Sequence, residues 1–167
     1  MDTDYITQPN TPVMPVYSPT QSCYMTIKRD SEDIGEKIVN LFKYEKVLSL
    51  ENKIQITYDI IMNTDKLTNF DDFFEEECHL TLVNWIYNTK KELKKGFLDG
   101  RSYHLIYNIL NIFETFPINL KDLLVLNIYQ KLNKIRKFMK KINFILFLKL
   151  DNLLSYWENF INDKLDA

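Results

Sequence analysis

Cysteine and histidine, the side chains best suited to nucleophilic or metal chemistry, are scarce in this sequence. There are two of each, at Cys23, Cys78, His79 and His104. Cys78 and His79 are neighbours, so on a helix their side chains would point about 100° apart and would not face one metal ion together. Two cysteines also form neither a four-cysteine zinc site nor a disulfide framework. We therefore expect structural or incidental roles for these four residues.

An acidic cluster, made of Asp71, Asp72, Glu75, Glu76 and Glu77, is the next candidate for chemistry. It lacks the alternating oxygen ligands and the turn glycine of a calcium loop. Acidic residues in a first helical turn also complement the helix dipole, so we interpret the cluster as a solvated helix face. With three glycines, the whole chain has no glycine-rich phosphate loop. We expect no cofactor and no enzymatic activity.

A run of basic residues carries the clearest functional signal. Lys131, Lys134, Arg136, Lys137, Lys140 and Lys141 follow one another with no acidic residue between them, whereas Leu132, Ile135, Phe138 and Met139 fall on another side at helical spacing. The pattern predicts a helix packed through its apolar side and positively charged outside. Three interpretations stay open: simple solubility in a lysine-rich composition, a surface for acidic protein segments, or weak binding of nucleic-acid phosphates.

The composition limits the class of protein. The chain has 167 residues, 46% hydrophobic residues and a formal net charge of −2, so it can bury one sizeable core but has no overall basic field. The first ten residues are polar and acidic, unlike a secretory signal. The longest apolar stretch, Ile142–Leu150, is far shorter than the roughly 18–20 residues of a spanning helix. We expect an intracellular, monomeric protein with free thiols.

Proline separates two regions of the chain. Four of the five prolines are Pro9, Pro12, Pro15 and Pro19, and proline disfavours helix nucleation. The sequence therefore predicts a flexible tail over residues 1–29 and a folded domain over residues 30–165.

Within the second region, apolar residues recur at helical spacing and no alternating strand pattern is present. Helices are expected from near Ser31, after Ser49, from Asn69, around Leu80–Tyr87, after Asp99 or Ser102 up to Phe116, and after Asn119. From Lys131 to about Lys164 we expect two helices that meet near Lys141–Asn143. The predicted fold is all-α, a compact bundle of seven to eight short helices, with Trp85 and Trp157 in its core.

Several short motifs follow one another in an order typical of one family. They are Phe70–Phe74, Leu82–Ile86, Asp99–Gly100, Ile106–Ile118, Leu123, Asn127–Gln130, Lys131–Lys141 and Leu153–Trp157. Over about residues 54 to 161 the sequence resembles the TFIIS N-terminal (LW) domain family, and within it the core of the Interacts-with-Spt-six elongation factors. One departure is that Asn127 and Tyr129 replace the two glycines of the family's SGxGK turn, and Gln130 replaces its basic residue. Asparagine tolerates a left-handed backbone but tyrosine does so poorly, so this turn is expected to be reshaped or helical.

The resemblance implies a right-handed helical bundle with no catalytic role. It implies a nuclear transcription elongation factor that binds a short linear segment of the histone chaperone Spt-six at elongating RNA polymerase II. Two alternatives stay open: another adaptor of the same domain type, such as a mediator or elongin subunit domain, and a nucleic-acid-binding domain that uses Lys131–Lys141.

The partner site is expected where the basic helix meets the neighbouring turns. Lys131, Lys134 and Lys137 would attract an acidic segment, while Ile135 and Phe138 are candidate walls for an aromatic anchor, unless the core uses both. Lys66 would add a second basic contact. Tyr103, at the end of the Gly96–Tyr103 turn, marks the next most plausible location.

Overall fold

The computed structural model describes residues 34–64, 73–74, 77–96, 99–116 and 118–166. Its α-helices are α2 (Ile34–Phe42), α3 (Leu50–Met62), α5 (Cys78–Lys94), α6 (Gly100–Thr115), α7 (Leu120–Leu124), α8 (Ile128–Lys134), α9 (Arg136–Ile142) and α10 (Phe144–Asp166), and a 3-10 helix, η3, spans Glu45–Val47. The described residues contain no strand, so the all-α prediction is confirmed. The predicted tail 1–29 and the predicted helix starts at Ser31 and Asn69 lie outside the described residues.

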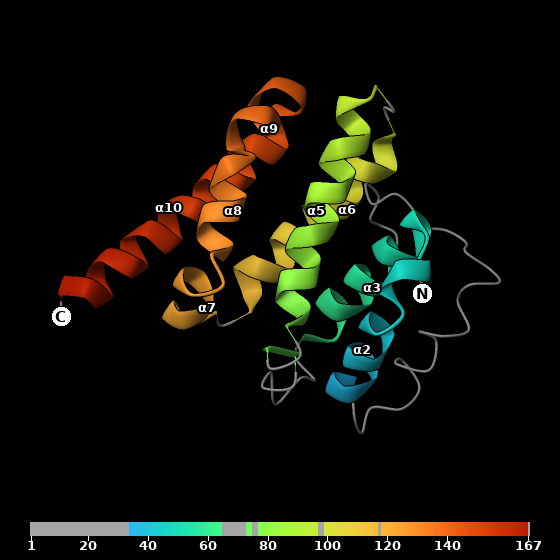
Figure 1. Ribbon diagram of the computed structural model, residues 1–167, viewed down its shortest axis with the longest axis horizontal. Coiled ribbons are helices and arrows are strands. Elements are labelled where there is room, and N and C mark those ends of the chain that lie inside the picture. Colours follow the sequence, from blue (N-terminus) through green and yellow to red (C-terminus); the bar gives the residue numbers. More distant parts are fainter. Residues whose placement is uncertain (1–33, 65–72, 75–76, 97–98, 117, 167) are drawn as a thin grey trace, which may run out of the picture.

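Helix α6 occupies the middle of the bundle. It packs against α3, α5 and α10, and α3 is its most extensive neighbour. Figure 1 shows α2 and α3 on one side of the central α5–α6 pair and α8, α9 and α10 on the other. The α3–α6 interface also contains buried hydrogen bonds, because the Asn108 side-chain amide donates to the Thr57 hydroxyl (3.2 Å) and to the Ile54 carbonyl (3.4 Å).

Side-chain oxygens begin three of the helices at the predicted positions. Ser49 accepts a hydrogen bond from the Asn52 amide, Asp99 from the Arg101 amide and Asn119 from the Asp122 amide. Each bond satisfies an amide that has no partner within its own helix. Of the two predicted caps for α6, Asp99 is correct. Helix α6 ends at Phe116, in extended backbone before Pro117, as the restriction on residues preceding proline predicts.

The residue before α8 has a left-handed backbone. Asn127 has φ 58° and ψ 30°, the left-handed conformation that asparagine tolerates, and it directly precedes the first residue of α8. Tyr129 lies inside that helix, where it has no need of a positive φ.

The basic stretch is two helices rather than one, so the prediction of a single helix up to Lys141 is wrong. Helix α8 ends and α9 begins at Ile135, whose amide bonds to the Leu132 carbonyl in a tighter, 3-10-like turn. Leu132, Ile135 and Met139, which lie on both sides of the bend and at it, are all buried. The two helices therefore both turn their apolar side chains toward the core. The second predicted break is confirmed, because Asn143 has an extended backbone between α9 and α10.

Both tryptophans lie in the core, as predicted. Trp85 of α5 is 0% exposed and packs with the Phe42 ring at a centroid distance of 5.2 Å. Trp157 of α10 is also buried and meets the Phe113 ring edge-on at 5.7 Å. The two residues therefore join α5 to α2 and α10 to α6. Among the described helices, none is both long and apolar enough to cross a membrane.

Candidate interaction surface on α5, α8 and α9

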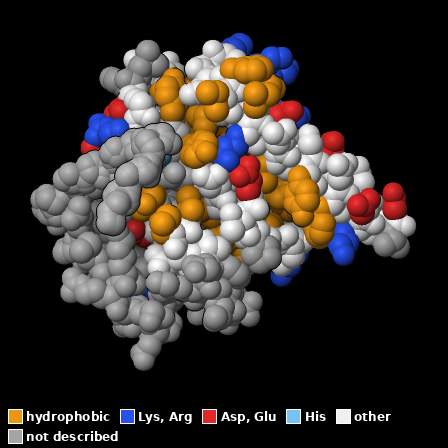
Figure 2. All heavy atoms as spheres, turned by 180° about the vertical axis from the view of Figure 1, so that it is seen from behind, with side chains coloured by type: hydrophobic (Ala, Val, Ile, Leu, Met, Phe, Trp, Pro, Cys, Tyr) orange, Lys and Arg blue, Asp and Glu red, His pale blue; other side chains and the backbone are white. Residues whose placement is uncertain are grey.

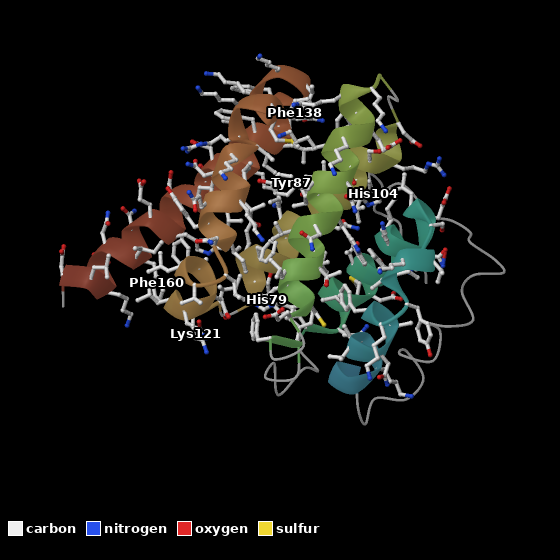
Figure 3. All side chains as sticks on the ribbon, viewed as in Figure 1. His79, Tyr87, His104, Lys121, Phe138 and Phe160 are labelled. Carbon is white, nitrogen blue, oxygen red and sulfur yellow. The ribbon has the colours of Figure 1, made fainter. Side chains whose placement is uncertain are left out.

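An aromatic ring of α9 faces two lysines of α5. The ammonium groups of Lys90 and Lys94 each lie 5.7 Å from the centroid of the Phe138 ring, within the range of cation–π attraction. Lys90 also lies 5.6 Å from the centroid of the Tyr87 ring. Figure 3 shows Phe138 and Tyr87 in the space between α5 and the α8–α9 pair. Two cations and two rings from separate helices therefore form one small cluster.

A hydrogen bond fixes this cluster to α8. The Tyr87 hydroxyl donates to the Lys131 backbone carbonyl at 2.6 Å, and partial burial raises the pKa of Tyr87 above its ordinary value. The phenol therefore stays protonated and remains a donor at neutral pH. Because Tyr87 and Lys90 share α5, the bond holds the lysine side of the cluster against the start of the basic stretch.

The described residues compensate little of the positive charge on this surface. Among the described residues, no carboxylate forms an ion pair with Lys90, Lys91, Lys94, Lys131, Lys134, Lys137, Lys140 or Lys141. Partial burial, and secondarily the charge of Lys94, lower the pKa of Lys90 below its ordinary value. The lowered pKa means that the charged form of Lys90 is destabilised, and an anion bound nearby would stabilise it. We call the surface formed by Tyr87, Lys90, Lys94 and Phe138, with Lys131, Lys134 and Lys137 on the adjoining helices, the basic–aromatic face.

Of the predicted site residues, Phe138 belongs to the lysine–ring cluster, Lys131 adjoins it through its backbone carbonyl, and Lys134 and Lys137 lie on the same two helices, α8 and α9. Lys134 and Lys137 are exposed, Lys131 is half-buried, and Phe138 is half-buried with its ring against the two lysines. Phe138 therefore packs partly against the core and stays partly exposed at the surface.

The other three predicted site residues are not part of the basic–aromatic face. Ile135 is only 1% exposed at the bend between α8 and α9, so its assignment as a wall of a surface site is corrected to a core residue. Tyr103 is half-buried near the start of α6, and the lysine–ring contacts of the described residues do not include it. Lys66 lies outside the described residues.

Sequence reasoning missed the contribution of α5. Lys90 and Lys94 belong to a second basic cluster, Lys90–Lys95, in which Glu92 is the one acidic residue and Lys95 is paired with it at 3.6 Å. The signal that would have found these lysines is their spacing of four, which places both on one side of a helix. That spacing does not say which ring they face, because Phe138 is more than forty positions later.

A separate buried pair joins α5 to α7. His79 is fully buried, and its Nε2 lies 3.3 Å from Oδ1 of Asp122, while the Phe74 ring meets the imidazole edge-on at 5.0 Å. Burial lowers the pKa of His79 below 6.5, and the negative charges of Asp122 and Glu77 oppose this only in part. The imidazole is therefore neutral at pH 7. Cys78 beside it is buried too.

This pair predicts a fall in stability on acidification. A folded-state pKa below the unfolded value means that the unfolded chain binds more protons, so the free energy of unfolding falls as the pH drops from about 7.5 through 6.5. The slope is at most about 1.4 kcal/mol per pH unit for each such histidine. Burial also lowers the pKa of His104, so both histidines contribute. Urea unfolding between pH 7.5 and 5.5 should show a shallower decline for His79→Gln than for the unchanged chain. If the protein without substitutions became more stable as the pH falls from 7.5 to 5.5, the lowered pKa values of the two histidines would be contradicted.

Two negative findings complete the description of the site. Within the described part of the chain, no three His, Cys, Asp or Glu side chains are grouped so as to hold a metal ion. No protein-family model, curated protein or solved structure matches this chain. The resemblance to the TFIIS N-terminal family therefore stays a prediction from the sequence.

Proposed function

We propose that this chain is a non-enzymatic adaptor that binds a short acidic segment of a partner protein on the basic–aromatic face. The observation that carries the proposal is that the Lys90 and Lys94 ammonium groups both lie 5.7 Å from the centroid of the Phe138 ring, and that neither lysine has a carboxylate partner among the described residues. An acidic segment would supply the missing negative charges. An aromatic side chain of the same segment would pack beside the Phe138 and Tyr87 rings and provide the anchor on which short-motif affinity depends.

The resemblance suggests which partner this is. We propose that the segment belongs to the histone chaperone Spt-six and that the chain acts in the nucleus as a transcription elongation factor at elongating RNA polymerase II. The support is the order of the sequence motifs, together with the all-helical fold that the resemblance implies. A mediator or elongin-like adaptor would use the same mode of binding with a different partner.

The same lysines also favour a second candidate, a domain that binds nucleic acid. Aromatic rings beside lysines are a common arrangement in proteins that bind single strands. Salt distinguishes the two functions, because phosphate binding releases counterions and falls steeply with salt concentration. Binding of an acidic segment anchored by an aromatic side chain loses mainly its long-range attraction.

The test is a fluorescence anisotropy titration of the full chain with a labelled N-terminal Spt-six peptide from the source organism and with a single-stranded oligonucleotide. The double variant Lys134→Glu, Lys137→Glu should bind the peptide at least tenfold more weakly at moderate salt, because it reverses two attracting charges. Its helical content should not change, since both side chains are exposed. The matched control is Lys43→Glu, Lys46→Glu, which reverses two exposed charges in the α2–η3 region, and it should bind like the unchanged chain.

Two results would contradict the adaptor proposal, and a third would contradict only its named partner. Peptide affinity equal in the two double variants would place the site elsewhere on the bundle. Tighter binding of the oligonucleotide, with a steep salt dependence, would favour the nucleic-acid candidate. Binding of other acidic segments but not of the Spt-six peptide would retain the adaptor and remove the named partner.

A further inference from the structure

The chain itself contains a short segment with the chemistry that the basic–aromatic face should bind. Residues 2–6 read Asp-Thr-Asp-Tyr-Ile, so two carboxylates come directly before a tyrosine and an isoleucine. We call these residues the Asp2–Ile6 segment, and it lies outside the described residues. It carries the groups that we assign to the partner, namely carboxylates for the lysines and an aromatic ring to pack beside Phe138 and Tyr87.

A second acidic and aromatic stretch of the chain is held away from this face. Phe73 within it is 6% exposed and meets the Phe42 and Phe116 rings edge-on, at centroid distances of 5.9 and 5.1 Å. Glu77 directly precedes the first residue of α5. Lys90 is 13 positions further along the chain, which on a helix is about 20 Å. The described residues of this stretch are therefore fixed at the opposite end of α5 from the lysines.

The receiving surface is positive and lies at one end of the molecule. Lys90 and Lys94 fall within the last five residues of α5, and neither has an ion-pair partner among the described residues. Figure 2, which views the molecule from behind, shows Lys and Arg side chains along its upper edge, the edge at which Figure 1 places α9. The carboxylates of the Asp2–Ile6 segment therefore complement this surface in charge.

The intervening chain is long enough to bring the segment to the face. Residues 7–33, which are 27 positions, connect it to Ile34, the first residue of α2. A coil of 27 residues has an average end-to-end distance of about 29 Å, and a fully extended chain of this length spans about 90 Å. Helix α5 has 17 residues and is about 26 Å long, and α2 packs against it. The connection can therefore follow the whole length of α5.

We propose that the Asp2–Ile6 segment binds the basic–aromatic face of its own chain and competes there with the partner segment. Its two carboxylates pair with Lys90 and Lys94. Tyr5 packs beside the Phe138 ring. The competition rests on the proposed function, because it requires a partner that uses the same face. A connection of this length gives an effective concentration of a few millimolar, so a contact with a dissociation constant of about 1 mM weakens partner binding severalfold.

An anisotropy titration of the full chain with the labelled Spt-six peptide measures the competition. The triple variant Asp2→Asn, Asp4→Asn, Tyr5→Ala lacks the pairing carboxylates and the ring. It should bind the peptide about three- to tenfold more tightly than the unchanged chain, because the face is no longer occupied.

The matched control is the triple variant Tyr24→Ala, Asp30→Asn, Glu32→Gln. It also removes two carboxylates and one tyrosine from the residues before α2, so it changes the net charge by the same amount. It should bind the peptide like the unchanged chain. Equal affinities of the two triple variants would overturn the competition and leave the partner site where it is proposed.

A cross-linking experiment detects the contact without any partner. A water-soluble carbodiimide joins a carboxylate to a lysine amine that touches it. In the monomer of the full chain, mass spectrometry should find links from the Asp2–Ile6 segment to Lys90 or Lys94. Links to Lys43 and Lys46 should be much rarer, although both lysines are exposed and closer to the segment in sequence. Equal yields at the two lysine pairs would overturn the proposal. If the Spt-six peptide does not bind the face, the proposed function fails, and the cross-links alone then support or overturn the contact.

Discussion

Replacing Trp85 by alanine is expected to lower the free energy of unfolding by about 3–5 kcal/mol. The side chain has no exposed surface, its ring contacts Phe42 of α2, and the Lys53 ammonium lies 5.2 Å from its centroid. Truncation removes these contacts and leaves a cavity between α5 and α2. A domain of this size is stable by about 5–15 kcal/mol, so the variant would lose a large share of its stability. Denaturant unfolding followed by circular dichroism measures the loss.

Tyr44→Ala is the matched control, because Tyr44 is also aromatic but is mostly exposed. Its free energy of unfolding should stay within about 0.5 kcal/mol of the unchanged chain. Equal stability of the Trp85 and Tyr44 variants would show that Trp85 does not lie in the core.

The largest expected effect on binding belongs to the double variant Lys90→Glu, Lys94→Glu. It should weaken binding of the acidic segment at least tenfold, and by more than Lys134→Glu, Lys137→Glu does. Lys90 and Lys94 are held beside the Phe138 ring, so little side-chain freedom remains to be lost when an anion binds. Lys134 and Lys137 are exposed and lack this restraint, so they lose more side-chain entropy when an anion binds.

Two further variants separate charge from ring. Lys90→Met, Lys94→Met keeps most of the apolar stems but removes both charges, and it should weaken binding less than the glutamate pair. Phe138→Leu keeps an apolar side chain and removes the ring, so Lys90 and Lys94 should regain side-chain freedom. In this background, the affinity lost on replacing Lys90 and Lys94 should be closer to that lost on replacing Lys134 and Lys137. Anisotropy titrations at one salt concentration measure all of these affinities. Equal losses in the two glutamate variants would show that the ring does not organise the site.

Three helix starts were predictable because their causes are local. Ser49, Asp99 and Asn119 each bond to an amide two or three positions later, and residue type alone indicates such a cap. The end of α6 was predictable for a similar reason, since proline restricts the residue before it. The bend at Ile135 has no proline or glycine as a signal, and it depends on which side chains the rest of the bundle buries.

The site was only half predictable, for the same physical reason. The basic stretch of α8 and α9 is visible in the sequence, but its pairing with Lys90 and Lys94 depends on how α5 lies against these helices. The contact between His79 and Asp122 likewise joins residues 43 positions apart. Helical spacing shows that a residue lies on a given side of its own helix, and only tertiary packing determines which helix meets that side.

The interface between α3 and α6 has a consequence for how the chain folds during synthesis. Asn108 follows its hydrogen-bond partner Thr57 by 51 residues. At roughly 5–20 residues per second, α6 leaves the ribosome on the order of 3–10 s after α3. During that interval the side of α3 that packs against α6 in the finished domain has no partner to cover it. Helix α10, which packs on α6 as well, is synthesised later still. The nascent chain therefore exposes an apolar surface for seconds, which is the kind of surface that chaperones bind.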